Sequence, residues 1–132
     1  DWLHVEDHCR GIEACLKRGI SGETYNIGGG EELPNLTVIE RICSEVDKAF
    51  GAIEGLADRY PDAPAACGRP TSELKTFVPD RVGHDRRYAV DATKARADLG
   101  YKPHHDFDSG LAATLRWYID NEAWWRNIQT TS

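Results

Sequence analysis

A short, densely charged stretch between two apolar runs places the strongest limit on how this chain can fold. Residues 80–88 read Asp-Arg-Val-Gly-His-Asp-Arg-Arg-Tyr, and the first eight positions carry two Asp, three Arg and one His. The apolar run at 74–78 is predicted to be a buried strand, and residues 88–91 a second short extended segment. Charges this dense between two buried elements are expected to lie near a core rather than to trail in solvent.

The residue types in this stretch favour an anion-binding loop. Gly83 allows the backbone to turn tightly or to approach a ligand. The planar guanidinium of Arg81 suits a diphosphate because it can bond two oxygens at once, and His84 can add a further donor. The alternative is a salt-bridged surface turn, which is the more common role of a loop rich in Asp and Arg.

Length and charge limit the possible classes of protein. The 132 residues suffice for one modest domain, and the net charge of −6 argues against a nucleic-acid-binding surface, which would be basic. No apolar run approaches the roughly 20 residues that span a bilayer. The chain contains no Met and begins abruptly at Asp1, so we expect a C-terminal fragment of a longer protein.

The four cysteines show no Cys-x-x-Cys spacing, so neither a disulfide framework nor a zinc site is expected. Three of them, Cys9, Cys15 and Cys43, fall in helical patterns and are predicted to be small buried apolar groups. This use of cysteine fits a reduced, cytoplasmic setting.

Hydrophobic periodicity predicts an α/β protein with about four helices and a few short strands. Helices are expected at 5–18, with Val5, Cys9, Ile12 and Leu16 as its apolar face, at 36–50 behind an Asn35 N-cap, from 91–94 to 99, and at 107–128. A short strand is expected at 24–27. Residues 51–73 are rich in Pro, Gly and Ala and predict a loop with one helical turn.

Other local patterns carry weaker signals. The glycine run at 28–30 lacks the Gly-x-Gly-x-x-Gly fingerprint, so we interpret it as a loop with unusual dihedral angles and not as a cofactor site. His4 and His8 do not match the zinc-protease motif because the glutamate between them is misplaced. The adjacent His104 and His105 could bind a stray metal ion, but an exposed turn is the more common case, and no metal site is predicted.

Four segments together resemble the dTDP-glucose 4,6-dehydratases, which are extended short-chain dehydrogenase/reductase enzymes. They are residues 80–91 (Asp-Arg-Val-Gly-His-Asp-Arg-Arg-Tyr-Ala-Val-Asp), 1–8, 22–29, and 99–103 followed by Trp117-Tyr118. Val82 stands where the family usually has Pro. Residues 51–73 lie outside the resemblance and are expected to form a surface loop insertion in the C-terminal, substrate-binding part formed by residues 1–132.

The resemblance implies a Rossmann-type NAD domain that lies mostly upstream of Asp1. It also implies conversion of dTDP-glucose to dTDP-4-keto-6-deoxyglucose and water, with NAD bound by the whole enzyme. The family's Tyr-x-x-x-Lys and Asp-Glu residues and its glycine-rich turn do not occur in this chain. We therefore expect no catalytic or cofactor-binding residue here, and an inactive fragment.

Six residues are expected, by resemblance, to hold the nucleotide sugar. They are Asn35, Asp80, Arg81, Val82, Gly83 and His84. The whole enzyme is expected to be a cytoplasmic homodimer without nucleic-acid or membrane partners, and the fragment is expected to self-associate. Two alternatives remain: a fragment of an NAD-dependent nucleotide-sugar epimerase or decarboxylase, and a stand-alone, non-catalytic binding module.

Overall fold

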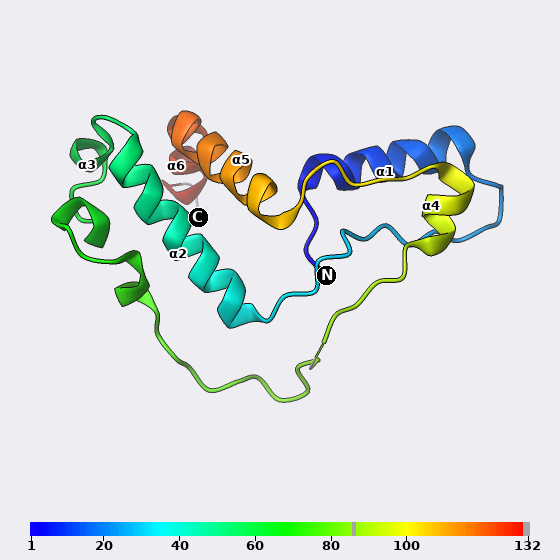
Figure 1. Cartoon of the computed structure of the whole chain (residues 1–132), viewed down its shortest axis with the longest axis horizontal. Coiled ribbons are helices and arrows are strands. Elements are labelled where there is room, and N and C mark those ends of the chain that lie inside the picture. The colour runs from blue at the N-terminus through cyan, green and yellow to red at the C-terminus, as the bar shows by residue number, and fades with distance from the viewer. Residues whose placement is uncertain (86, 131–132) are drawn as a thin grey trace. The chain divides into compact units, whose positions relative to one another are not determined.

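The computed structural model describes residues 1–85 and 87–130, which form two compact units. Unit 1 comprises Asp1–Pro34 and Asp80–Gly110, and unit 2 comprises Asn35–Pro79 and the described residues from Leu111 onward. Figure 1 traces the helices in chain order: α1 (Val5–Arg18), α2 (Asn35–Ala52), α3 (Leu56–Arg59), α4 (Thr93–Leu99), α5 (Phe107–Asp120) and α6 (Glu122–Thr130), with short 3₁₀ turns η1 (Pro64–Cys67) and η2 (Thr71–Leu74). The predicted excess of helix over strand is confirmed.

Unit 1 is built around the packing of α1 against α4 and the segment that follows it. Its buried cluster contains Ala14 of α1 together with Ala92, Ala95, Leu99 and Tyr101. The Arg18 side chain joins the two helices by donating to the Leu99 carbonyl at 2.7 Å. Small alanines dominate this contact, so the two helices approach closely.

Helix α1 has the predicted bounds, but its predicted apolar face is exposed. Val5 is 66% exposed, Leu16 is 83% exposed, and Cys9 is also exposed. The buried side of α1 instead carries Asp7, Gly11 and Ala14. Periodicity located the stripe of large apolar residues correctly, but small residues on another side of the helix make the contact with α4 and its neighbours.

Helix α4 confirms its predicted boundaries. The Thr93 N–H donates to the Asp91 carboxylate at 2.9 Å, which satisfies a free donor at the start of the helix. The helix ends at Gly100, whose φ of +61° is the left-handed conformation that favours glycine. In the same way α2 occupies its predicted place, although Asn35 is its first residue rather than a cap in front of it.

Unit 2 packs α2 with α3, η1, η2 and the described residues from Leu111 onward. Its buried residues include Val38, Cys43, Leu56 and Ile119. The Asp47 side chain on α2 accepts bonds from the backbone N–H and the hydroxyl of Thr71, at 3.0 and 2.5 Å. Residues 51–73 were expected to contain one helical turn, but they contain α3, η1 and the start of η2. Whether they are an insertion stays a prediction.

The single helix predicted at 107–128 is divided into α5 and α6 at Asn121. The backbone N–H of Asn121 donates to the Trp117 carbonyl at 2.9 Å, and its side-chain amide donates to the same oxygen at 2.8 Å. An asparagine side chain that competes for backbone acceptors favours a turn over continued helix. The apolar periodicity continued through this residue and hid the break.

The strands predicted at 24–27 and 74–78 are absent from the described residues, whose one β-bridge joins Trp2 to Glu31. Leu74, Phe77 and Val78 are 66%, 82% and 76% exposed, so the prediction of a buried strand there was wrong. A strand needs neighbouring backbone to pair with, and these segments have no such neighbour within the described part of the chain.

Two further findings concern membranes and thiols. None of the helices in residues 1–85 and 87–130 is both long enough and apolar enough to cross a bilayer. All four cysteines, which lie in the described ranges, are free thiols. Cys43 is buried and Cys15 half-buried, but Cys9 is exposed, which corrects its prediction as a buried residue.

Candidate functional site: the charged loop of unit 1

The loop at residues 80–84 closes on itself through Asp80. The Asp80 carboxylate accepts the Arg81 backbone N–H at 2.8 Å and lies 2.8 Å from Nδ1 of His84. The His84 N–H donates to the Arg81 carbonyl at 3.3 Å, and Gly83 provides the turn with a φ of +76°. The His84 side chain and then the Arg81 N–H lower the pKa of Asp80. The predicted role of Gly83 as a turn residue is confirmed.

This loop lies in solvent, contrary to the expectation that it would be held near a core. Val82 is fully exposed, and the side chains of Asp80 and His84 are 78% and 39% exposed. Tyr88 and Val90, which follow the loop, are 58% and 39% exposed. The expectation depended on a buried element on each side, and neither forms because neither segment has a β partner among the described residues.

Arg81 and Arg87 differ in their partners. Arg87 forms an ion pair with Glu32, with its Nε 2.9 Å from the carboxylate, so the salt-bridge interpretation holds for this residue. Asp85 raises the pKa of Tyr88, and Arg81 acts on the same pKa in the opposite direction, so both side chains lie near the Tyr88 hydroxyl. Unlike Arg87, Arg81 forms no ion pair with a carboxylate among residues 1–85 and 87–130, so its charge remains available to an anion. Arg86, the third arginine of the stretch, lies outside the described residues.

The structure brings five of the six predicted site residues together on one turn, residues 80–84 of unit 1. The sixth, Asn35, is the first residue of α2 in unit 2. Its position at a helix N-terminus suits an anion. Convergence of Asn35 with Arg81 and His84 on one ligand stays a prediction, as do the binding roles of all six residues.

The glycine run at 28–30 is packed against the start of the chain. A Cβ on Gly29 would lie 2.1 Å from the Trp2 carbonyl oxygen. The N–H groups of Gly29 and Gly30 donate to the Asp1 carboxylate, at 2.7 Å and 3.2 Å for their shorter bonds. Gly30 has a φ of +81°, which confirms the expected unusual dihedral angle. The N–H groups that would cradle a phosphate are thus already bonded within the chain, and the run does not fit a dinucleotide.

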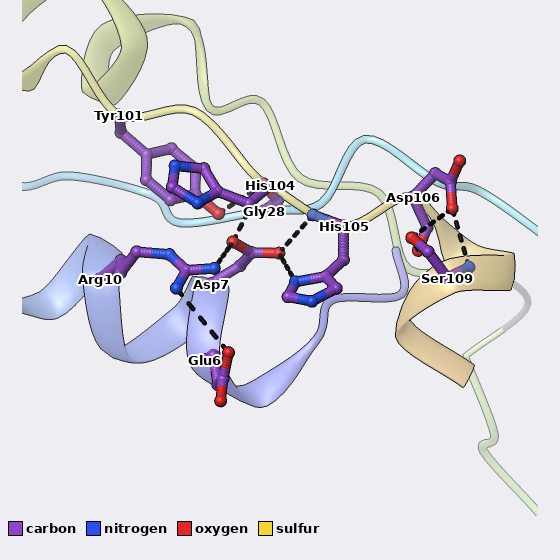
Figure 2. A network of polar contacts seen from close by, with 9 residues as sticks. All are labelled: Glu6, Asp7, Arg10, Gly28, Tyr101, His104, His105, Asp106 and Ser109. Carbon is purple, nitrogen blue, oxygen red and sulfur yellow. Dashed lines mark hydrogen bonds and ion pairs between the residues drawn. The ribbon is translucent and has the colours of Figure 1, made fainter. Parts of the chain in front are cut away.

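A buried carboxylate, Asp7, was missed by the sequence analysis. Figure 2 shows it between Arg10 and the segment carrying His104 and His105. Asp7 is 0% exposed and accepts the backbone N–H groups of His104 and His105 at 2.8 and 3.0 Å. It also accepts from the Arg10 guanidinium at 2.9 Å and lies 3.1 Å from Nδ1 of His105. Burial would raise the pKa of Asp7, but the two N–H groups and the two side chains outweigh it and hold the pKa far below its usual range.

The Asp7 contacts fasten the segment after Tyr101 to the first turn of α1. The sequence shows Asp7 only as an acidic residue in the first turn of a helix, which is common and does not indicate a buried site. Apart from Arg10, its partners are His104 and His105, which lie far from it in the sequence, so no local spacing could reveal them.

Comparison with known proteins identifies the family. The family model described as GDP-mannose 4,6 dehydratase matches residues 1–114. A curated dTDP-glucose 4,6-dehydratase of Neisseria meningitidis serogroup B is 48% identical over 97% of this chain, and one of Escherichia coli is 41% identical over 100% of it. In both cases the chain spans 33% of the relative's length.

Solved structures agree with these matches. A dTDP-glucose 4,6-dehydratase of Bacillus anthracis in complex with NAD is 36% identical and superposes with a TM-score of 0.72 over 96% of this chain and 33% of its own. The Streptomyces venezuelae enzyme, also with NAD bound, is 38% identical with a TM-score of 0.71 over 95% of this chain and 32% of its own. The predicted α/β class and the resemblance to dTDP-glucose 4,6-dehydratases are thereby confirmed. The chain belongs to the GDP-mannose 4,6 dehydratase family and spans about a third of the length of the curated relatives it matches.

Proposed function

We propose that this chain is the C-terminal, substrate-binding part of a dTDP-glucose 4,6-dehydratase. The whole enzyme would convert dTDP-glucose to dTDP-4-keto-6-deoxyglucose and water, with NAD bound. The observation that carries the proposal is that relatives bearing this name match 97% and 100% of the chain at 48% and 41% identity. The domain would comprise residues 1–132, with 51–73 as an insertion at its surface.

The chain's own contribution would be to hold the nucleotide diphosphate. Arg81 can bond two phosphate oxygens, and His84 can add its second ring nitrogen, since Nδ1 faces Asp80. Asn35 would add the N-terminus of α2, while Asp80, Val82 and Gly83 shape the turn that presents Arg81. Contacts remote from the reacting carbons position the sugar, so they can raise turnover as well as affinity.

NAD would be held by the other two thirds of the enzyme. The residues of this chain do not fit it, because the glycine run is filled by Trp2 and Asp1 and no Tyr-x-x-x-Lys pair occurs. No step of hydride transfer or elimination is therefore assigned to a residue of this chain. A cytoplasmic homodimer without nucleic-acid or membrane partners completes the proposal.

The test is the substrate preference of the full-length protein that contains these residues. It is incubated with dTDP-glucose, GDP-mannose or UDP-glucose, and the products are identified by mass spectrometry and NMR. We expect loss of one water and a 4-keto-6-deoxy sugar, with the highest kcat/KM for dTDP-glucose. Faster turnover of GDP-mannose would replace the proposed substrate, and an epimerised product without water loss would replace the proposed reaction.

A further inference from the structure

We propose that His4, Glu6 and His105 form a binding site for a divalent transition-metal ion such as Zn²⁺. Each residue offers one ligand atom, and these atoms lie within 4.8 Å of one another. All three belong to unit 1: His4 precedes α1, Glu6 lies in its first turn, and His105 comes from the segment after α4. Two imidazoles and a carboxylate form a ligand set that Zn²⁺ accepts readily. The inference does not depend on the proposed enzymatic activity.

The Asp7 carboxylate orients the His105 ring. Its Nδ1 lies 3.1 Å from the buried Asp7 carboxylate, which is itself fixed by two backbone N–H groups (Figure 2). A carboxylate bonded to one ring nitrogen orients the imidazole and makes the other nitrogen a better metal ligand. Histidines that ligate zinc commonly have their second ring nitrogen hydrogen-bonded to a carboxylate in this way.

His4 has an unsatisfied nitrogen. Its Nδ1 is buried and has no hydrogen-bond partner within residues 1–85 and 87–130. Buried polar atoms without a partner are rare in folded proteins, and a metal ion coordinated by Nδ1 would satisfy this atom. The His4 and His105 rings already lie together, with centroids 4.1 Å apart and planes inclined by 37°.

Only a small movement is needed to close the site. Ligand atoms around one tetrahedral Zn²⁺ lie roughly 3.3–3.6 Å apart, so the longest separation in the cluster, up to 4.8 Å, must shorten by up to about 1.5 Å. Glu6 can move, because its side chain is 64% exposed and its ion pair with Arg10 is long, at 3.8 Å. Such an exposed pair contributes little stability. The ion would then fasten the start of α1 to the segment that carries His105.

The test is calorimetric titration of the intact protein with Zn²⁺ after chelator treatment. We expect one ion per chain at these residues, and a weakening of roughly tenfold or more in Glu6→Gln. Glu6 is exposed, so this variant should fold normally. Glu13→Gln is its matched control, because Glu13 is an exposed glutamate on the same helix. His4→Phe keeps a ring against His105 and should weaken binding similarly, whereas His8→Phe, at an exposed histidine of α1, should bind as the unchanged protein does.

Two results would overturn the proposal. One is the absence of any Zn²⁺ binding in the unchanged protein. The other is binding that is equally strong in Glu6→Gln and Glu13→Gln, which would place the ion elsewhere. NMR of the imidazole carbons provides a readout that does not depend on any substitution: addition of Zn²⁺ should shift the His4 and His105 signals and leave that of His8 unchanged.

Discussion

Arg81 lies on a solvent-exposed turn and forms no ion pair with a carboxylate among residues 1–85 and 87–130. Its charge is therefore not neutralised within the turn, unlike that of Arg87, which pairs with Glu32. In the full-length enzyme, Arg81→Ala should weaken dTDP binding by roughly 1.5–3 kcal/mol, the usual value of a hydrogen bond to a charged group. Calorimetric titration with dTDP measures this directly.

Arg116→Ala is the control for that measurement, because Arg116 is an exposed arginine paired with Asp120 on α5. It should leave the affinity for dTDP unchanged. If Arg81→Ala also leaves the affinity unchanged, the turn has only a structural role and the salt-bridged alternative is correct.

Gly29 and Gly51 should respond to alanine in opposite directions. A Cβ on Gly29 would lie 2.1 Å from the Trp2 carbonyl oxygen. Gly29→Ala must therefore move the backbone at Gly29 away from that at Trp2, and it should lower the free energy of unfolding by about 1–3 kcal/mol. A Cβ on Gly51 would meet nothing within 4 Å, and Gly51 lies in α2, so Gly51→Ala should be neutral or stabilising by about 0.5–1 kcal/mol. Urea denaturation of both variants measures these changes in the free energy of unfolding. Equal effects would mean that the packing at Gly29 is not retained in solution.

At the scale of elements, Glu122 joins α6 to α3. It accepts from Arg59 at 2.8 Å and from Arg126 at 2.5 Å, and these two contacts, in that order, lower its pKa to about 2. The usual pKa of the side chain is 4.5. Since the folded pKa is the lower one, the stabilisation is fully present above pH 4.5 and is lost as the pH falls towards 2.

Thermal melts between pH 6 and pH 2 should therefore show Glu122→Gln losing less stability on acidification than the unchanged protein. Glu54→Gln, at an exposed glutamate of the same unit, should follow the unchanged protein throughout. An identical acid dependence in all three proteins would show that the contact between α3 and α6 does not form in solution.

Elements with local signals were predictable from the sequence. The bounds of α1 follow from apolar spacing with acidic residues in its first turn and basic ones in its last, and α4 follows from Asp91 and Gly100. The break at Asn121 was not predictable from periodicity, because Trp117, Trp124 and their neighbours continue the pattern through the turn. Strands could not be judged locally at all, since a strand exists only where another segment pairs with it.

The candidate site divides in the same way. Residues 80–84 were identifiable because their charges and glycine are contiguous in sequence. The Asp7 contacts and the cluster of His4, Glu6 and His105 were not, because they depend on α1 meeting the segment after Tyr101. Exposure was misjudged at residues 74–78 for a related reason: apolar composition indicates that a segment prefers burial, but not what buries it.

At the scale of the whole molecule, the described residues expose an unusual amount of large apolar surface. On α1 and just beyond it, Val5, Ile12, Leu16 and Ile20 are 66%, 48%, 83% and 64% exposed. Phe77 and Val78 are 82% and 76% exposed on a segment without a β partner. Contiguous exposed apolar side chains and unpaired extended backbone are features that another chain tends to cover.

The chain expressed alone should therefore self-associate or aggregate, and it should neither turn over dTDP-glucose nor bind NAD. Light scattering should report species larger than one chain, and Leu16→Lys should reduce that association by placing a charge at an apolar position of α1 that is 83% exposed. A monodisperse monomer with a cooperative melt would show that these residues form an independent domain, which would favour the stand-alone binding module. Micromolar NAD binding in calorimetry would contradict the assignment of the cofactor to the rest of the enzyme. The two contradicting results can be told apart. An independent domain could still bind dTDP through Arg81, whereas a misassigned cofactor site would be detected by titration with NAD alone.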